Sequence, residues 1–537
     1  MPIEREVMLA ALREEEYDLL VIGGGATGCG VALDAASRGL KVAQLERYDF
    51  AEGTSGRSTK LIHGGVRYLE KALRNFDYAQ MKLVLEGLSE RAKLLKIAPH
   101  VVHTVPLITP LYRWLQIPYI WLGLKIYDLL AGKKGISKSS FLSVARLRRT
   151  FPELDARGLK AGVLYYDGQF NDIRMVVALV QTAAQHGATC VNYTEAVGFD
   201  KKEGSIVSTR VRDNITGEIF AVRSKCVINA AGPFADNICH LDEPANEPVL
   251  SASTGVHIVI DKRFMPRNTG MLIPKTEDGR ILFAIPWEHH LLIGSTDTPA
   301  EIVDHPPVSE GEIDYILRHM DCYLEPSPTR NDVKSAWSGI RPLISAAGHE
   351  STQSLVRGYK IDISPSGLIS VFGGKWTSYR LMAEKAVDTA IKRFSLPSEG
   401  PSETDMLTLA GSENYHKDAI KSLVGEGLGL DIAEHLHGAY GDKASTLLRL
   451  SRRGLGKRLA EGHPYIEAEV VYGVREELVI RAVDFLCRRI PLALLDIEAA
   501  KSVAPRVIEL MASESSWSEE RIASEEELVR ERLFGAL

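Results

Sequence analysis

The stretch YDLLVIGGGATGCGVALDAASRGLKVAQLE, residues 17–46, decides the fold. Its first six residues are apolar and rich in strand-forming side chains, and a glycine turn leads from them into a segment with helical periodicity. Gly23, Gly25 and Gly28 match G-x-G-x-x-G, in which glycines permit a tight turn and bring backbone N–H groups and a helix N-terminus to a pyrophosphate. We therefore predict a strand, turn and helix that bind a dinucleotide.

The context of this motif strengthens the prediction. Ala32, Ala36 and Gly39 are small where the helix must lie close to a sheet, and a second apolar strand, KVAQLE, ends on Glu46. Glu46 is 18 residues beyond Gly28, close to the roughly 20 expected for an acid that binds a ribose hydroxyl. This context disfavours the alternative that the turn joins strand and helix and binds nothing.

The loop that follows separates FAD from NAD. Residues 47–73, RYDFAEGTSGRSTKLIHGGVRYLEKAL, form a long Gly/Ser/Thr-rich stretch where a nicotinamide domain would continue with another helix and strand. Such a loop brings many backbone amides alongside a large flat ligand. The sequence thus favours FAD.

The totals of the chain limit the other classes. Its 537 residues exceed the about 250 to 300 that one hydrophobic core supports, so two or three domains are expected. Lys plus Arg number 64 against 70 Asp plus Glu, and no long basic run is present, which argues against nucleic-acid binding. The six cysteines show neither C-x-x-C pairs nor histidine partners at zinc-ligand spacing, so we expect no metal site.

Further motifs give the chain a family resemblance. They are TSGRSTKLIHGGVRYLE (54–70), INAAGPFAD (228–236), GVHIVI (255–260), IPWEHHLLIGSTDTP (285–299), AWSGIRPL (336–343) and FGGKWTSYR (372–380). In order and approximate spacing they resemble the FAD-dependent glycerol-3-phosphate dehydrogenases, both the bacterial aerobic and the mitochondrial enzymes. The resemblance covers about residues 17 to 400 and continues more loosely beyond.

The resemblance implies a particular architecture. An FAD/NAD(P)-binding Rossmann-like α/β (α+β) domain of the amino-acid-oxidase-like flavoenzyme type is expected, with an antiparallel-sheet substrate domain and a C-terminal all-helical domain. The FAD-dependent oxidoreductase region is expected over 1–400 and the helical cap over 401–537. Within the first region, FAD-binding segments are expected at about 17–90, 160–240 and 360–400, and substrate-domain segments at about 91–159 and 241–359.

The resemblance also implies an activity. It is oxidation of sn-glycerol 3-phosphate to dihydroxyacetone phosphate by hydride transfer to FAD, with the electrons passed to a membrane quinone. One alternative is an oxidase of the same family that uses oxygen. Another, of a different class, is a flavin-binding sensor without turnover, since fold does not fix function.

Glycerol 3-phosphate carries about two negative charges, so its site needs fixed cations, and arginine suits bidentate phosphate contacts. Arg67, Arg341 and Lys375 are the candidates, in HGGVRYL, SGIRPL and FGGKW. Tyr68 could add a phenolic hydrogen bond or belong to the core, and Arg357 matches another basic position of the family. These residues are expected to bind substrate.

The oxidation also needs a group that takes the hydroxyl proton. His63 and His257 are the histidines within family motifs; His63 could instead only orient the loop, and an alcohol or water polarised by arginine remains an alternative to both. Arg341 and Lys375 are expected at the reacting centre as well, Lys375 to stabilise negative charge on reduced flavin.

The cofactor-binding residues come from three parts of the chain. Ser58 to Lys60 could equally form a solvated loop. The set is Gly23, Gly25, Gly28, Glu46, Ser58, Thr59, Lys60, Gly64, Ala231, Gly232, Gly374 and Thr377.

Residues 111–130, LYRWLQIPYIWLGLKIYDLL, are rich in Trp and Tyr. The uncharged run from Trp114 to Leu124 is shorter than the about 18 residues that a spanning helix needs. Aromatics flanked by Arg and Lys suit an element that lies in the headgroup region, although a pair of aromatic core helices would look similar. In the family this segment meets the membrane near the quinone.

We therefore expect a peripheral membrane protein that contacts the lipid bilayer surface. Its place would be the cytoplasmic face of the inner membrane in a bacterium or the mitochondrial inner membrane in a eukaryote. The acidic N-terminus resembles neither a secretory signal nor a transit peptide, so either the protein stays inside the cell where it is made or a presequence is missing. A homodimer is left open.

Overall fold

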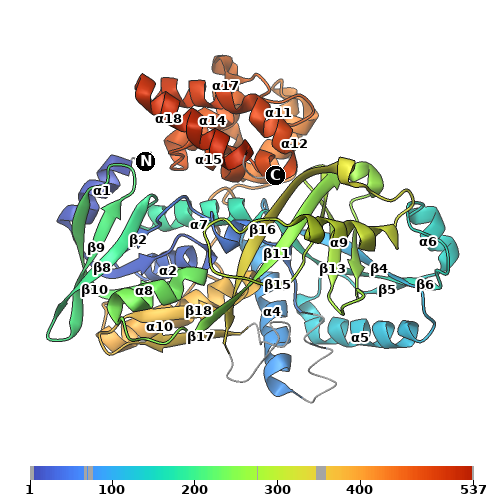
Figure 1. Cartoon of the computed structure of the whole chain (residues 1–537), viewed down its shortest axis with the longest axis horizontal. Helices are drawn as coiled ribbons and strands as arrows, with labels where there is room; N and C mark the ends of the chain where they lie inside the picture. The colour runs from blue at the N-terminus through green and yellow to red at the C-terminus, as the bar shows by residue number, and fades with distance from the viewer. Residues whose placement is uncertain (1–4, 66–68, 70–76, 275, 346–357, 535–537) are drawn as a thin grey trace.

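The computed structural model describes residues 5–65, 69, 77–274, 276–345 and 358–534 (Figure 1). Two sheets lie side by side in these residues, and the C-terminal helices lie over both (Figure 1). The nucleotide-binding motif opens the first sheet, while Arg341 and His257 stand in the second.

The first sheet has a parallel centre in the order β18-β10-β1-β2-β7. β17 pairs antiparallel with β18, and β8 and β9 extend β10 as an antiparallel meander. The strands are β1 (Glu16–Ile22), β2 (Val42–Leu45), β7 (Thr189–Val191), β8 (Thr194–Lys202), β9 (Ser205–Asp213), β10 (Ile219–Asn229), β17 (Tyr359–Ile363) and β18 (Ile369–Gly373).

Both faces of this sheet are covered, which explains the continuous apolar run in β1. Leu19 and Val21 pack on one face beneath α2 (Ala26–Ser37), α7 (Asp172–Gln185) and α10 (Tyr379–Phe394). Leu20 and Ile22 pack on the other face with α1 (Arg5–Glu14) and α8 (Ala235–Asp242).

The second sheet runs in the order β15-β11-β14-β13-β12-β4-β6-β3, with β16 paired to β11 and β5 to β6. Its pairs are antiparallel except β4 with β12. The strands are β3 (Leu61–Ile62), β4 (Val102–Leu111), β5 (Ser140–Leu142), β6 (Ala161–Phe170), β11 (Leu250–Asp261), β12 (Gly270–Ile273), β13 (Leu282–Trp287), β14 (His290–Gly294), β15 (Thr298–Pro299) and β16 (Val333–Ile344).

Successive side chains of β11 point to opposite faces of the second sheet, and each face is covered by its own set of helices. Ile258 and Ile260 face α6 (Val144–Thr150) and α9 (Glu310–Asp321). Val259 faces the C-terminal helices, and α5 (Gln116–Ala131) packs Leu124 into that same cluster. α4 (Tyr78–Ile97) contacts α5 and the first strands of this sheet.

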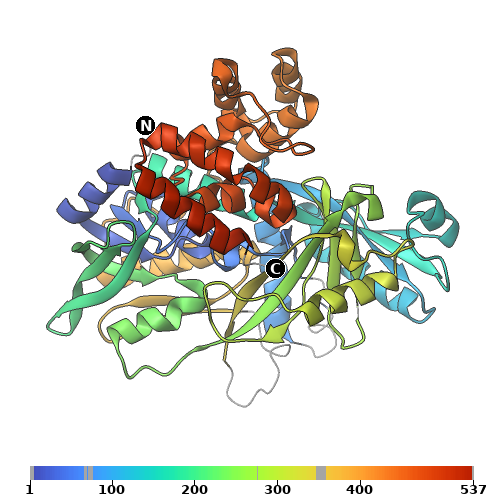
Figure 2. The same ribbon diagram turned by 45° about the horizontal axis from the view of Figure 1, so that its top comes forward.

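The C-terminal region is helical throughout residues 419–534, apart from connecting turns. Its helices gather above the two sheets in Figure 1 and come forward over their junction in Figure 2. They are α11 (Ala419–Gly425), α12 (Leu430–Tyr440), α13 (Ala444–Leu450), α14 (Glu467–Glu476), α15 (Ala482–Asp484), α16 (Leu492–Leu495), α17 (Ile497–Ser515) and α18 (Glu519–Val529).

This arrangement confirms the predicted fold class: a Rossmann-like domain, a mainly antiparallel second sheet and a helical C-terminal domain. The domain boundaries stay a prediction, with one difference. β6 lies inside the segment 160–240 assigned to FAD binding, yet it pairs with β4 in the second sheet. β6 pairs along the full length of β4 and so belongs to the second sheet. The helices that cover the first sheet begin again only after β6, with α7.

Candidate active site

The glycine turn between β1 and α2 is closed by backbone contacts that leave no room for side chains. Gly23 has φ +119°, and a Cβ on it would lie 2.5 Å from the carbonyl oxygen of Ala230. A Cβ on Gly28 would lie 1.9 Å from the carbonyl oxygen of Gly23. Gly25 is the N-cap of α2, so the N-terminus of this helix lies at the turn. The backbone N–H groups of such a helix N-terminus can bind a phosphate group.

Glu46 follows β2 and lies beside this turn. Its Oε2 accepts a hydrogen bond from Gly24 N–H at 2.6 Å, and its Oε1 accepts one from Tyr48 N–H at 3.0 Å. Loss of water around the carboxyl raises the pKa of Glu46 to about 7. The acid therefore lies beside the glycine turn, where a dinucleotide-binding fold has the acid that binds a ribose hydroxyl.

Two polar residues that the sequence analysis missed complete the turn. Ser55 Oγ accepts a hydrogen bond from Ala26 N–H at 2.9 Å, and the backbone oxygen of Ser55 accepts one from Trp376 Nε1–H at 2.8 Å. The loop after β2 is thus fastened both to the N-terminus of α2 and to the turn after β18. The family motifs contain both residues, but a serine and a tryptophan there carry no signal of their own.

The next part of the loop is anchored by a buried ion pair. Lys60 is 0% exposed, and its Nζ donates to Asp172 Oδ1 at 2.6 Å and to the backbone oxygen of Gly56 at 2.7 Å. Ser58 Oγ donates to Asp172 Oδ2 at 2.7 Å. These side chains fasten the loop to the start of α7, which removes the solvated-loop alternative for Lys60. A cofactor contact for Ser58, Thr59 and Lys60 stays a prediction.

Arg341 and His257 share one face of the second sheet. The register pairs Ser253 with Arg341, Gly255 with Gly339 and His257 with Trp337, so all these positions project to the same side. A Cβ on Gly255 would lie 2.0 Å from Arg341 Nη2, so glycine is required for the guanidinium to lie across the strand.

The Arg341 guanidinium is held by several acceptors. Nη1 donates to the backbone oxygen of Thr254 at 3.0 Å and lies 3.3 Å from Asp297 Oδ1. Nη2 donates to Ser295 Oγ at 2.6 Å and to the backbone oxygen of Thr296 at 2.9 Å. The cation is therefore fixed in direction while part of its side chain stays exposed.

His257 joins this face to the cofactor loop, which is the segment 46–64 that follows β2. Its Nε2 lies 2.9 Å from Thr59 Oγ1, and its ring stacks on Trp337 with centroids 4.4 Å apart. Burial, strengthened by the positive charges of Arg341 and Lys60, holds the pKa of His257 well below its usual value. The imidazole is consequently neutral near pH 7, and the same burial and charges disfavour its protonated form.

The other predicted residues lie along the turn after β18 and the loop facing it. Thr377 Oγ1 donates to the backbone oxygen of His63 at 3.5 Å, and Gly64 N–H donates to Tyr127 Oη at 3.0 Å. Gly374 has φ +98°, and Lys375 follows it just before α10.

The predicted residues after β10 form another turn. Ala231 N–H donates to Asn229 Oδ1 at 3.2 Å, and Gly232 has φ +58°. Arg67, Tyr68 and Arg357 lie outside the described residues.

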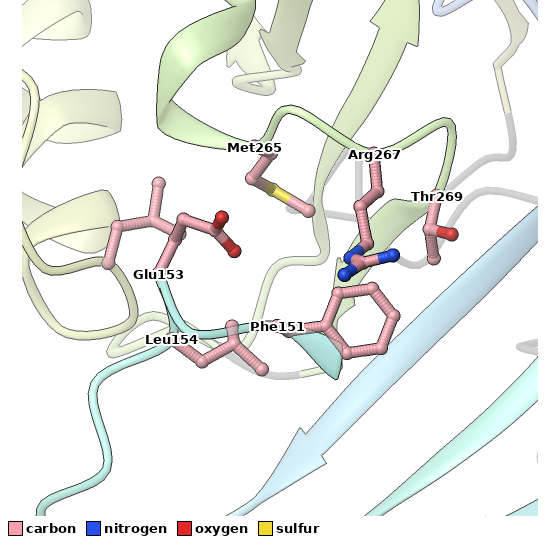
Figure 3. A pocket seen from close by; sticks show the side chains of 7 residues that line it. Phe151, Glu153, Leu154, Met265, Arg267 and Thr269 are labelled. Carbon is pink, nitrogen blue, oxygen red and sulfur yellow. The ribbon is translucent and has the colours of Figure 1, made fainter. Parts of the chain in front are cut away.

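Two depressions elsewhere do not coincide with these residues. One, lined by Phe151, Leu154 and Met265 at the edge of the second sheet (Figure 3), leaves room for about one water molecule. A wider one of about 750 Å³ lies between α1 and the C-terminal helices and is bordered by Arg5, Trp517 and Arg521. Neither contains a residue predicted to bind cofactor or substrate.

The residues around the glycine turn fit FAD. The side-chain-free turn, the N-terminus of α2 and the acid after β2 suit the adenosine diphosphate half. The cofactor loop is bonded to this turn through Ser55. Four residues further along the same loop, Thr59 lies beside His257. The chain thus offers one continuous path from the dinucleotide motif to the Arg341 and His257 face.

Comparisons with known proteins agree with this geometry. The family model described as FAD dependent oxidoreductase matches residues 18–380, and the C-terminal domain of alpha-glycerophosphate oxidase matches residues 402–522. The mitochondrial glycerol-3-phosphate dehydrogenase of Mus musculus is 46% identical over 99% of this chain and 75% of its own length. That of Arabidopsis thaliana is 43% identical over 99% of this chain and 88% of its own length.

Two solved structures are similar as well. The glycerol-3-phosphate dehydrogenase from Bacillus halodurans complexed with FAD is 30% identical, with a TM-score of 0.80 over 98% of this chain and 97% of its own. The L-alpha-glycerophosphate oxidase from Mycoplasma pneumoniae with FAD bound is 17% identical, with a TM-score of 0.55 over 70% of this chain and 95% of its own. The second likeness extends to the fold alone.

Proposed function

The chain belongs to the FAD-dependent glycerol-3-phosphate dehydrogenases, and from this premise we propose how its residues bind and oxidise the substrate and where the electrons go. It is an FAD-dependent enzyme that converts sn-glycerol 3-phosphate to dihydroxyacetone phosphate. Bound FAD supplies the acceptor for the hydride that leaves C2 of the substrate. A membrane quinone is the proposed next acceptor.

The observation that carries the site assignment is the contact between Thr59 and His257. Through this contact the loop of the dinucleotide-binding domain lies against the sheet that bears Arg341, which supports a single junction for the cofactor and substrate groups. Neither the glycine turn alone nor the arginine alone would define a reacting centre.

Arg341 is assigned to the anionic substrate. Asp297, Ser295 and two backbone carbonyls fix its guanidinium from one side, which pre-orders a cation for a phosphate group. Lys375, Arg67, Arg357 and Tyr68 are proposed to complete the substrate site, as the family motifs imply. Lys375, at the N-terminal side of α10, also suits stabilisation of negative charge on the reduced cofactor.

His257 is the proposed proton acceptor for the C2 hydroxyl. Its imidazole is neutral, is oriented by stacking on Trp337 and lies on the Arg341 face. His63 stands at the other side of the loop, where its backbone oxygen accepts from Thr377. An orienting role for the cofactor loop suits His63 better.

The activity and its acceptor are tested together by anaerobic spectroscopy. We expect the flavin absorption of the purified protein to bleach on addition of glycerol 3-phosphate, but not of glycerol. A short-chain quinone should then restore the colour faster than air does. A flavin band that glycerol 3-phosphate leaves unchanged would favour the flavin-binding sensor, and faster reoxidation by oxygen would favour the oxidase.

Gly255→Ala tests the position of Arg341. The added methyl group would lie 2.0 Å from Nη2 and displace the guanidinium. We expect KM for glycerol 3-phosphate to rise by about tenfold to a hundredfold, a loss of about 1.4 to 2.8 kcal/mol of binding, with unchanged FAD content. Gly311→Ala, where a Cβ meets no atom within 4 Å, is the control. An unchanged KM in Gly255→Ala would exclude Arg341 as a substrate contact.

His257→Asn tests the proton acceptor. We expect flavin bleaching at saturating substrate in stopped flow to slow by about 10²-fold to 10⁴-fold, the usual contribution of a general base. Because the pKa of His257 is depressed, the base stays neutral as pH falls, so the wild-type rate should stay level from about pH 8 to about pH 6. A wild-type rate that falls with an apparent pKa near the ordinary histidine value would contradict the assignment to His257, whose pKa is depressed.

The exposed surface formed by α5 and the two residues before it, Trp114 and Leu115, supports a peripheral membrane location. Trp114, Leu115 and Tyr119 are 68%, 88% and 57% exposed, and Leu122 and Leu129 are 61% and 79% exposed. Leu124 and Tyr127 pack inward, so the segment is a surface helix rather than a pair of aromatic core helices. No helix among the described residues is long and apolar enough to cross a bilayer. An apolar aromatic face of this kind suits the headgroup layer, where a quinone is within reach.

Replacement of Trp114, Leu115 and Tyr119 by serine tests the membrane contact. Co-sedimentation with phospholipid vesicles should fall by about tenfold or more, because burial of these side chains supplies about 1.5 to 3 kcal/mol each. Bleaching by glycerol 3-phosphate should not change. Val207→Ser with Ile219→Ser, on the exposed β9–β10 hairpin away from α5 (Figure 1), is the control. Undiminished vesicle binding by the α5 variant would contradict the proposal.

A further inference from the structure

The C-terminal domain contacts the cofactor loop through charged side chains. The loop contributes Asp49 and Glu52; the C-terminal domain contributes Arg488, Arg489 and Arg532. We propose that Arg488, Arg489 and Arg532 are positioning residues that hold this loop in its FAD-binding form, so that the C-terminal domain sets the affinity for FAD. The inference rests on the FAD-binding function of the loop and is independent of the electron acceptor.

Asp49 is the centre of the contact. Arg489 binds it with both terminal nitrogens, Nη1 to Oδ2 at 2.8 Å and Nη2 to Oδ1 at 2.9 Å, and Arg488 Nε donates to Oδ2 at 2.6 Å. The Asp49 and Arg489 side chains are 0% exposed and Arg488 is 7% exposed. The two guanidinium groups hold the pKa of Asp49 below its usual value despite its burial, so the carboxylate is charged.

The arginines are themselves fixed by their own domain. Arg489 Nη2 also donates to the backbone oxygen of Glu477 at 2.6 Å, and Arg488 Nη2 donates to Asp484 Oδ1 at 2.7 Å. A charged fork fixed at both ends gives a defined geometry. The position of Asp49 is therefore dictated by the C-terminal helices.

A second contact lies three residues further along the loop. Glu52 is 8% exposed, and its carboxylate lies 3.3 Å from Arg488 Nη2 and is also bound by Arg532. His305 contacts Arg532 and lies 3.0 Å from Arg57 Nη2. The final helical turn of the described chain is thereby joined to the same loop.

These two contacts lie between Glu46, which is assigned to FAD, and Ser55, which is bonded to the N-terminus of α2. Glu46 lies three residues before Asp49, and Ser55, which caps α2, lies three residues after Glu52. Three residues of chain leave little freedom, so a shift of Asp49 or Glu52 displaces the acid or the serine. Burying such ion pairs adds little net stability compared with apolar packing, whereas it does specify geometry. This favours a positioning role over a purely stabilising one.

The test is FAD release from holoenzyme on serial dilution, followed by the fluorescence of free flavin. In Arg489→Gln, Arg488 still neutralises Asp49, so the domain should fold while the loop loosens. We expect the Kd for FAD to rise by about tenfold, which corresponds to about 1.4 kcal/mol. Arg489→Lys keeps the charge but loses the two-point contact and should give an intermediate Kd.

Arg380→Gln is the matched control. Arg380 on α10 forms the same kind of buried two-point contact, to Glu90 at 2.7 and 2.9 Å, and its side-chain hydrogen bonds and ion pairs among the described residues involve neither the loop nor Arg489. It should lower the thermal unfolding midpoint about as much as Arg489→Gln while leaving the Kd for FAD unchanged. Equal weakening of FAD in both variants, or an unchanged Kd in Arg489→Gln, would overturn the proposal.

Arg532→Gln keeps the inference testable if the buried variants do not fold. Its side chain is 26% exposed, so folding should tolerate the change, and we expect a rise in Kd of about threefold, in the range of a partly exposed ion pair. An unchanged Kd in folded Arg532→Gln would remove Arg532 from the positioning set and, without folded buried variants, overturn the proposal. Because FAD release needs no substrate, a failure of the proposed oxidation would be distinguishable.

Discussion

The structure of the site depends on the buried ion pair between Lys60 and Asp172. An ammonium group with no exposure is strongly disfavoured, and loss of its partner would cost about 3 to 5 kcal/mol. The pair therefore forces the loop after β2 to run to the start of α7. From there β3 enters the second sheet beside β6. A single buried charge thus sets how the nucleotide-binding sheet and the substrate sheet meet.

Charge also joins the third part of the molecule to this loop. The C-terminal helices cover an apolar face of the second sheet, but apolar contact is non-directional and tolerates sliding. The pairs of Asp49 with Arg488 and Arg489, and of Arg174 with Glu477, have defined geometry. Apolar packing stabilises the contact between the domains, and these charged pairs fix the position of one domain relative to the other.

What sequence reasoning could predict follows from the distance over which each interaction acts. The strand, glycine turn, helix and Glu46 are neighbours in sequence, so periodicity and spacing predicted the Rossmann-like start. The family motifs extended the prediction to the second sheet and to Arg341 and His257, whose place on one face follows from strand register. The clash between Gly255 and Arg341 needs coordinates, although the glycine itself stood in a quoted motif.

Contacts between distant residues were out of reach. Asp49 and Arg489 are 440 residues apart, and neither position carries a local pattern that would pair them. β6 lies within the approximate segment 160–240 expected to bind FAD but pairs with β4 in the second sheet, because the sequence of a strand does not reveal its partner. Ser55 and Trp376 were missed because their partners, the backbone N–H of Ala26 and the backbone oxygen of Ser55, lie 29 and 321 residues away and have no sequence signature.

Membrane contact through the exposed face of α5 would change how the two substrates reach the enzyme. If this helix rests in the headgroup layer, the two substrates reach the enzyme through media of different dimension. Glycerol 3-phosphate arrives from bulk water, whereas the electron acceptor arrives by lateral diffusion within a film of lipid. The second encounter then depends on the mole fraction of quinone per lipid, and diluting the membrane in buffer would leave it unchanged.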